Sequence, residues 1–165
     1  MTQPSPRVII VLPTYNEREN LAVLAPQLKA LGIEGLHLMV VDDNSPDGTG
    51  KFADQMAAAE PEWVSVVHRP GKGGLGRAYV HGFKVALTMG APIIVQMDAD
   101  FSHPPATIPV LLDKIRDFDV VLGSRYVNGG SLDEKWGPAR RFISGIGNTF
   151  ARALTGLPVR DATGG

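Results

Sequence analysis

The sequence contains no cysteine, which excludes disulfide bonds and thiolate metal sites and is typical of a reducing compartment. It also lacks an excess of either charge. The 16 Lys and Arg against 17 Asp and Glu leave a formal net charge of −1, so no general electrostatic argument favours nucleic-acid binding. Apolar runs stay well short of the ~18 residues that span a bilayer, and residues 1–6 do not resemble a signal peptide. We therefore expect a cytoplasmic protein that is either soluble or peripheral to a membrane.

The residues that are present describe a globular α/β protein, with 44% hydrophobic and 20% charged residues. A chain of 165 residues is long enough for one domain with a core and too short for two ordinary domains. Strands are expected at 7–12, 36–41, 63–67, 92–97 and 119–122, and helices at 17–31, 49–59, 77–89 and 105–116. Their alternation predicts right-handed βαβ units and a Rossmann-like, three-layer α/β/α fold with a mainly parallel sheet.

The most informative segment is Asp98-Ala99-Asp100, which directly follows the predicted strand at 92–97. It puts two carboxylates at the carboxyl edge of the sheet, where ligands bind in open α/β folds. Two close carboxylates are costly to hold together unless a cation lies between them. A divalent ion such as Mg²⁺ is often held by one or two carboxylates and completes its shell with phosphate oxygens. The alternative is a solvated pair that caps the following helix.

Polar residues also follow the first two predicted strands. Residues 13–17 carry an aromatic ring and polar groups suited to a nucleoside, although Asn16 and Glu17 equally suit a helix N-terminus. Residues 42–49 are rich in Asp and equally suit an Asx-type turn before a capped helix. The convergence of three such strand ends on one edge of the sheet favours a nucleotide site.

The glycine-rich loop at 70–76 lacks the ending of a Walker phosphate loop. We expect its backbone to approach the nucleotide side, with Lys72 facing solvent. The histidines at 68, 81 and 103 have no metal-ligand spacing, so we expect capping or packing roles for them.

The pattern changes after Gly123, where a loop at 128–131 precedes a predicted helix at 138–154. Arg140 and Ser144 lie one helical turn apart and so share a face, where they could bind a phosphate. A solvated helix face is the alternative for these residues. This basic and apolar helix suits either a membrane interface or packing on a core. Because the sequence stops on a Gly-Gly turn, we expect a fragment that is truncated at its C-terminus.

Five segments in order carry a family resemblance. They are Leu12–Leu21, Val41–Thr49, Gly74–Tyr79, Met97–Pro105 and Gly123–Tyr126. Together they resemble family 2 glycosyltransferases with the GT-A fold, and among these the dolichyl- or polyprenyl-phosphate mannose synthases. The resemblance implies a single GT-A catalytic domain over residues 1–165, with a nucleotide-sugar half at 1–104 and an incomplete acceptor-side half at 105–165.

The resemblance also implies roles for individual residues. The guanosine site would be lined by Pro13, Tyr15, Glu17, Val41 and Asp43. Asp98 and Asp100 would hold Mg²⁺ or Mn²⁺ against the diphosphate, with the Ala99 backbone close to the nucleotide. Ser102 stands where some relatives carry Gln as a further metal ligand. Arg125 would approach the phosphates or the acceptor, and Asp100 and Arg125 are the predicted catalytic residues.

The implied reaction is metal-dependent, inverting transfer of mannose from GDP-mannose to a polyprenyl monophosphate at the cytoplasmic face of a membrane. A lipid monophosphate has a second pKa of about 6 and is already anionic, so we expect no dedicated catalytic base. Arg140 and Ser144 would bind this acceptor phosphate, no nucleic acid would take part, and a separate domain or subunit is a possible membrane anchor. Two alternatives stay open, namely UDP-glucose or another nucleotide sugar as donor, and a nucleotide-binding fragment without turnover.

Overall fold

The computed structural model describes residues 7–124, which fall into two compact units that divide after Pro109. The first unit holds the sheet and the three strand-end segments. Arg125, Arg140, Ser144 and the predicted helix at 138–154 lie outside the described residues. The assignment of the whole chain to a single domain stays a prediction.

The first unit is built on a parallel sheet of four strands. These are β1 (Val8–Thr14), β2 (Leu36–Asp42), β3 (Val64–His68) and β4 (Ile93–Gln96), in the order β3-β2-β1-β4. Every residue of β1 and β2 is buried, as expected of a parallel sheet covered on both faces. The four strands confirm the parallel sheet that the sequence predicts over this part of the chain.

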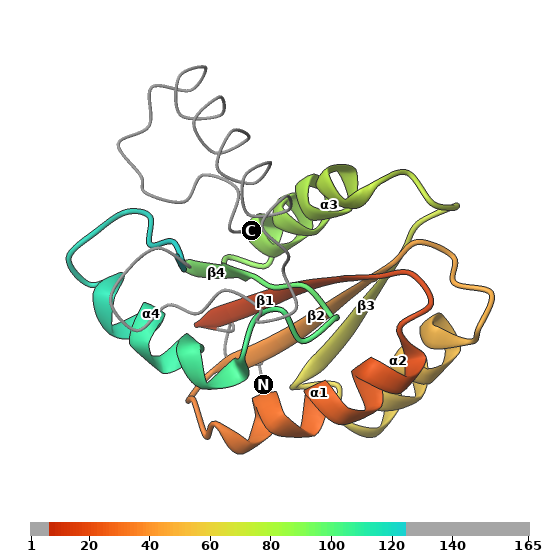
Figure 1. Ribbon diagram of the computed structural model, residues 1–165, viewed down its shortest axis with the longest axis horizontal. Coiled ribbons are helices and arrows are strands. Elements are labelled where there is room, and N and C mark those ends of the chain that lie inside the picture. Colours follow the sequence, from red (N-terminus) through yellow and green to blue (C-terminus); the bar gives the residue numbers. More distant parts are fainter. Residues whose placement is uncertain (1–6, 125–165) are drawn as a thin grey trace, which may run out of the picture. The chain divides into compact units, whose positions relative to one another are not determined.

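Helices cover both faces of this sheet. As Figure 1 shows, α1 (Arg18–Ala30) and α2 (Thr49–Ala59) lie on one face, and α3 (Leu75–Thr88) lies on the other. The inward face of α1 carries Leu21, Leu24, Ala25 and Leu28, which follow the helical repeat. The three-layer α/β/α arrangement predicted from the alternation is thus confirmed.

The packing of α3 on the sheet depends on one glycine. Gly82 lies on the buried face of α3, and the residues of that face include Tyr79, which belongs to a core cluster with Val11 and Val41. A Cβ atom at Gly82 would come within 2.4 Å of Val11 Cγ1 and 3.0 Å of Val41 Cγ2. The absence of a side chain therefore lets α3 approach β1 and β2 closely.

β1 extends two residues further than the predicted strand and includes Pro13. Proline has no N–H to donate and is normally excluded from the middle of a sheet. Here β4 pairs with β1 only from Val8 to Val11, so Pro13 lies beyond the end of that ladder and no donor is required on that side.

The strand predicted at 119–122 is wrong: these described residues form no strand. Val120 is 73% exposed and Leu122 is 47% exposed, and no neighbouring strand takes up their backbone hydrogen bonds in the part of the chain that the structure describes. The helix predicted at 105–116 is shorter, with a 3₁₀ turn at Pro105–Thr107 followed by α4 (Ile108–Lys114). Within residues 7–124, none of the helices has the length and hydropathy needed to cross a bilayer.

We expect Gly82→Ala to lower the free energy of unfolding by about 1–2 kcal/mol. Overpacking a core costs about 1–3 kcal/mol, and the better helix propensity of Ala offsets up to about 1 kcal/mol of this. Urea unfolding followed by circular dichroism measures the change. Gly76→Ala is the control, because among the described residues nothing lies within 4 Å of a Cβ at that position of the same helix. Equal stability of the two variants would show that Gly82 does not limit the packing of α3.

Candidate functional site

The strand order creates a switch point between β1 and β4. From β1 the chain passes through α1 to β2 on one side, and it later returns through α3 to β4 on the other side. In open α/β sheets, ligands bind outside the carboxyl ends of the strands at such a point. The Met97 N–H donates to Val11 O at 3.3 Å, so the segment that starts at Asp98 leaves the sheet beside the end of β1. The topology therefore brings Asp98 and Asp100 to the same edge as the segment at 14–17.

Hydrogen bonds order the loop that carries these two aspartates. Asp98 is half-buried, accepts a hydrogen bond from the Tyr79 hydroxyl at 2.5 Å, and donates its backbone N–H to His103 Nδ1 at 3.2 Å. Asp100 is exposed and accepts the Ser102 N–H at 2.9 Å. The His103 contact agrees with the capping or packing role that we expected for this histidine.

The environment of the loop shifts two pKa values in opposite directions. Partial burial acts to raise the pKa of Asp100, but hydrogen bonds from Ser102 and the nearby His103 outweigh it, so the pKa lies below its ordinary value. Burial raises the pKa of Tyr79, and the hydrogen bond to Asp98 and the charges of Asp98 and Asp100 raise it further. The Tyr79 hydroxyl therefore keeps its proton and remains a donor to Asp98.

The donor set of this loop fits a hard divalent cation. Among residues 7–124, no group of three or more His, Cys, Asp or Glu side chains converges as a closed metal cage. Two carboxylates are nevertheless sufficient for Mg²⁺ or Mn²⁺ when phosphate oxygens and water complete the shell. Ser102, predicted as a further ligand, instead hydrogen-bonds to Asp100 in this structure, and its part in metal binding stays a prediction.

A left-handed residue follows each of the three strand ends. Asn16 has φ 62°, Asn44 has φ 57° and Phe101 has φ 62°. Asparagine tolerates this conformation, but a bulky residue such as phenylalanine pays about 1–3 kcal/mol for it. Such strain is concentrated at functional sites, and here it turns the chain sharply directly after Asp100.

The N-terminus of α1 is capped by the loop that follows β2 and by the first residue of α2. Ser45 Oγ accepts the Asn16 N–H at 3.0 Å, Thr49 Oγ1 accepts the Glu17 N–H at 3.0 Å, and Asp47 Oδ2 accepts the Arg18 N–H at 3.2 Å. The N-cap residue of α1 is Glu17, and its side chain makes no capping hydrogen bond in the described chain. The alternative in which Asn16 caps this helix is therefore wrong.

Asp47 also forms the Asx-type turn that was expected before α2, because its Oδ1 accepts the Thr49 N–H at 2.9 Å. Slight burial acts to raise the pKa of Asp47, but the hydrogen bonds from Thr49 and Arg18 outweigh this effect, so the pKa lies below its ordinary value. This carboxylate is therefore occupied by the protein itself. Asp42 is occupied in the same way, by the Thr14 hydroxyl and by the N–H and hydroxyl of Ser45.

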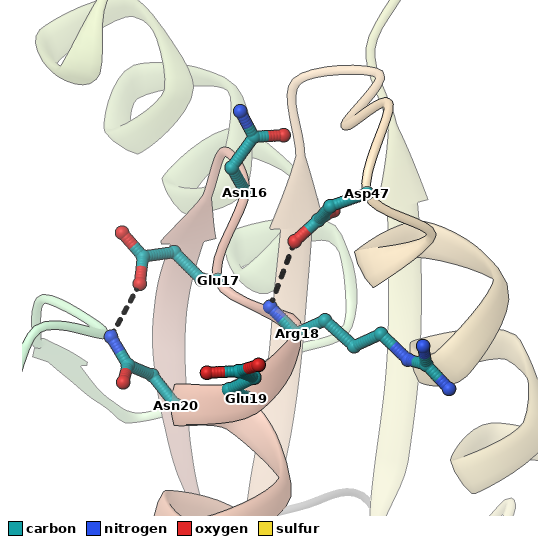
Figure 2. Close-up of a pocket in the computed structure, with 6 residues that line it drawn as sticks. All are labelled: Asn16, Glu17, Arg18, Glu19, Asn20 and Asp47. Carbon is teal, nitrogen blue, oxygen red and sulfur yellow. Dashed lines mark hydrogen bonds between the residues drawn. The ribbon is translucent and has the colours of Figure 1, made fainter.

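A pocket of about 310 Å³ lies at this end of α1, and Figure 2 shows the side chains that line it. It is lined by Asn16, Glu17, Arg18, Glu19, Asn20 and Asp47. Glu17 Oε2 accepts a hydrogen bond from Asn20 Nδ2 at 2.6 Å, which holds the glutamate carboxylate toward its own helix. Of the residues predicted to line the guanosine site, Glu17 is thus the one that belongs to this pocket.

The glycine-rich loop is fastened to two other predicted guanosine residues. Asp43 is buried, forms an ion pair with Arg69, and accepts the Gly73 N–H at 3.0 Å. The Lys72 side chain is exposed, as expected, but its Nζ also lies 4.2 Å from the centroid of the Tyr15 ring. This cation–π contact and the Asp43 contacts join the loop to the ends of β1 and β2.

The remaining predicted nucleotide residues have buried side chains, namely Pro13, Val41 and Ala99. Val41 packs in the core against α3, so only its main chain is left to face a ligand. Sequence reasoning assigned no site role to Arg69, Lys72 or Tyr79. Tyr79 stood in the segment at 74–79 that carries the resemblance, whereas the sequence holds no comparable signal for Arg69.

Comparison with known proteins agrees with this fold and these motifs. The sequence model of glycosyl transferase family 2 matches residues 9–165. A polyprenol monophosphomannose synthase from Mycolicibacterium smegmatis is 43% identical over 164 residues, which are 99% of this chain and 61% of the relative. An undecaprenyl-phosphate mannosyltransferase from Micrococcus luteus is 45% identical over 159 residues, 96% of this chain and 64% of the relative. The chain thus spans less than two thirds of the length of either relative.

A solved structure extends the comparison to three dimensions. A mannosyltransferase from Pyrobaculum calidifontis, in complex with GDP-Man and Mn2+, superposes with a TM-score of 0.54 at 26% identity, over 71% of this chain and 34% of that protein. The parallel sheet and its helices are therefore of the GT-A type. Since the family model covers nearly the whole sequence, the chain belongs to glycosyl transferase family 2.

Proposed function

We propose that this chain binds GDP-mannose and a divalent cation and transfers mannose to a polyprenyl monophosphate, with inversion at the sugar. The observation that carries the proposal is the position of Asp98-Ala99-Asp100 at the β1/β4 switch point, on the sheet edge that also bears Tyr15 and Asp43. The names of the relatives support the lipid phosphate acceptor, and the GDP-Man and Mn2+ of the Pyrobaculum protein support the donor and the cation.

The described residues would have different roles in binding the donor. The Tyr15 ring, which contacts Lys72 of the glycine-rich loop, is suited to stack on a nucleoside. Asp43 holds the same loop in place through Gly73. Asp98 and Asp100 are the groups that would bind Mg²⁺ or Mn²⁺. The bound cation would act as a Lewis acid that offsets the charge developing on the leaving diphosphate.

The acceptor side of the proposal rests on residues outside the described part of the chain. Arg125 would approach the phosphates, and Arg140 with Ser144 would bind the acceptor phosphate at a membrane surface. An acceptor that is already anionic needs cationic partners to bring it near the diphosphate, and no general base.

Two alternatives share every motif of the site. A sibling enzyme would use UDP-glucose or another nucleotide sugar with the same lipid phosphate. A nucleotide-binding module would bind the donor without transferring the sugar.

We expect Asp100→Asn to abolish the gain in GDP affinity that Mn²⁺ provides, because the amide removes the negative charge on which the cation depends. Calorimetric titration of GDP with and without Mn²⁺ measures this gain. The loss should be at least about tenfold, since changes in outer-shell partners alone cost 10–100-fold. Asp54→Asn is the matched control, because Asp54 is an exposed carboxylate on α2 that pairs with His68 at the end of β3 and is not part of the Asp98–Asp100 loop. An unchanged gain in Asp100→Asn would contradict the metal assignment.

The donor is tested by a single-turnover assay with polyprenyl phosphate and a panel of nucleotide sugars. We expect radiolabelled mannose from GDP-mannose to appear in the lipid fraction only when Mg²⁺ or Mn²⁺ is present. Transfer of glucose from UDP-glucose, with none from GDP-mannose, would replace the proposed donor by the first alternative. Tight, metal-dependent GDP binding without any transfer would instead support the nucleotide-binding module.

A further inference from the structure

Tyr79 reaches the proposed metal site from the hydrophobic core. It lies on the buried face of α3, is only 5% exposed, and donates its hydroxyl to Asp98 Oδ1 at 2.5 Å. We infer that Tyr79 is a positioning residue that holds the Asp98 carboxylate in the orientation needed to bind the divalent cation. This inference rests on the metal-binding role that the proposed function gives to Asp98.

Core packing fixes the Tyr79 ring independently of the loop. The ring packs against Phe83, one turn further along α3, with centroids 5.7 Å apart and planes inclined by 31°. Gly82 allows α3 to lie close to β1 and β2, and Tyr79 belongs to the same buried cluster as Val11 and Val41. Because protein cores are close-packed, the hydroxyl has little freedom to move away from Asp98.

Asp98 is held at a second point by its main chain. Its N–H donates to His103 Nδ1, and the preceding residue, Met97, is hydrogen-bonded to β1. A carboxylate only accepts hydrogen bonds and has about four lone-pair sites on its two oxygens, so the Tyr79 hydroxyl must be the donor and it occupies one of these sites. The other sites stay available for a cation, in an orientation that is set before the cation arrives.

This geometry matches the way in which proteins tune metal ligands. A hydrogen-bond donor behind a ligating carboxylate fixes its rotamer, and loss of such a partner typically weakens metal binding by about 10–100-fold. Tyr79→Phe removes the hydroxyl and keeps the ring that fills the core. It therefore separates the positioning of Asp98 from the packing of α3.

The experiment measures Mn²⁺ affinity of the 165-residue chain in the presence of GDP, from the electron paramagnetic resonance signal of free Mn²⁺. We expect Tyr79→Phe to weaken Mn²⁺ binding by about tenfold or more. Its metal-free GDP affinity and its apo melting temperature should stay close to those of the parent chain. Phe83→Leu is the packing control, because it disturbs the neighbouring ring and leaves the hydroxyl in place. It should lower the melting temperature and keep the Mn²⁺ affinity.

Mn²⁺ affinity of Tyr79→Phe within twofold of the parent chain would overturn the inference. An equal loss of Mn²⁺ affinity in Phe83→Leu would also overturn it, because the effect would then follow packing and not the hydroxyl. Asp98→Asn distinguishes the inference from the proposed function on which it rests. If Asp98→Asn abolishes Mn²⁺ binding and Tyr79→Phe does not, only the positioning role fails. If neither variant changes Mn²⁺ binding, the proposed role of Asp98 as a metal ligand fails.

Discussion

The central strand β1 has to satisfy its backbone hydrogen bonds on both sides, because all seven of its residues are buried. β2 pairs with it along its full length, and β4 pairs with it from Val8 to Val11. Since all pairings are parallel, the carboxyl ends of these three strands meet at one edge. The position of the candidate site therefore follows directly from the way in which β1 is paired.

The aspartates that gather at this edge have different partners. Asp42 and Asp47 accept hydrogen bonds from the loops around them, and Asp43 is paired with Arg69 and the glycine-rich loop. These three carboxylates fasten the segments at 14–18, 42–49 and 69–73 to one another. The described contacts of Asp98 and Asp100 are fewer and leave oxygen lone pairs available for a cation. The proposed metal chemistry thus depends on the two aspartates of this edge whose oxygens have the fewest partners in the described chain.

Helix α3 connects this edge to the core. Its distance from the sheet depends on Gly82, which has no side chain, and its Tyr79 hydroxyl donates a hydrogen bond to Asp98. The hydrophobic packing that stabilises the fold therefore also sets the surroundings of a proposed ligand. This arrangement explains how a loop with the left-handed Phe101 keeps a defined geometry, because contacts to α3 and β1 oppose the strain in its backbone.

The apolar runs and their alternation with amphipathic segments were sufficient to predict the four parallel strands, the helices between them and the edge at which the polar segments meet. They were not sufficient at Val120–Leu122, where an apolar run has no neighbouring strand in the described chain, because pattern alone does not report whether backbone partners exist. The sequence by itself determined which chemistry the strand ends carry, since residue type and spacing decide that. Only the tertiary structure decided that Arg69 neutralises Asp43, that Lys72 lies over Tyr15 and that Tyr79 donates to Asp98. These contacts join segments distant in sequence, and their geometry depends on how closely a helix or loop packs against the sheet.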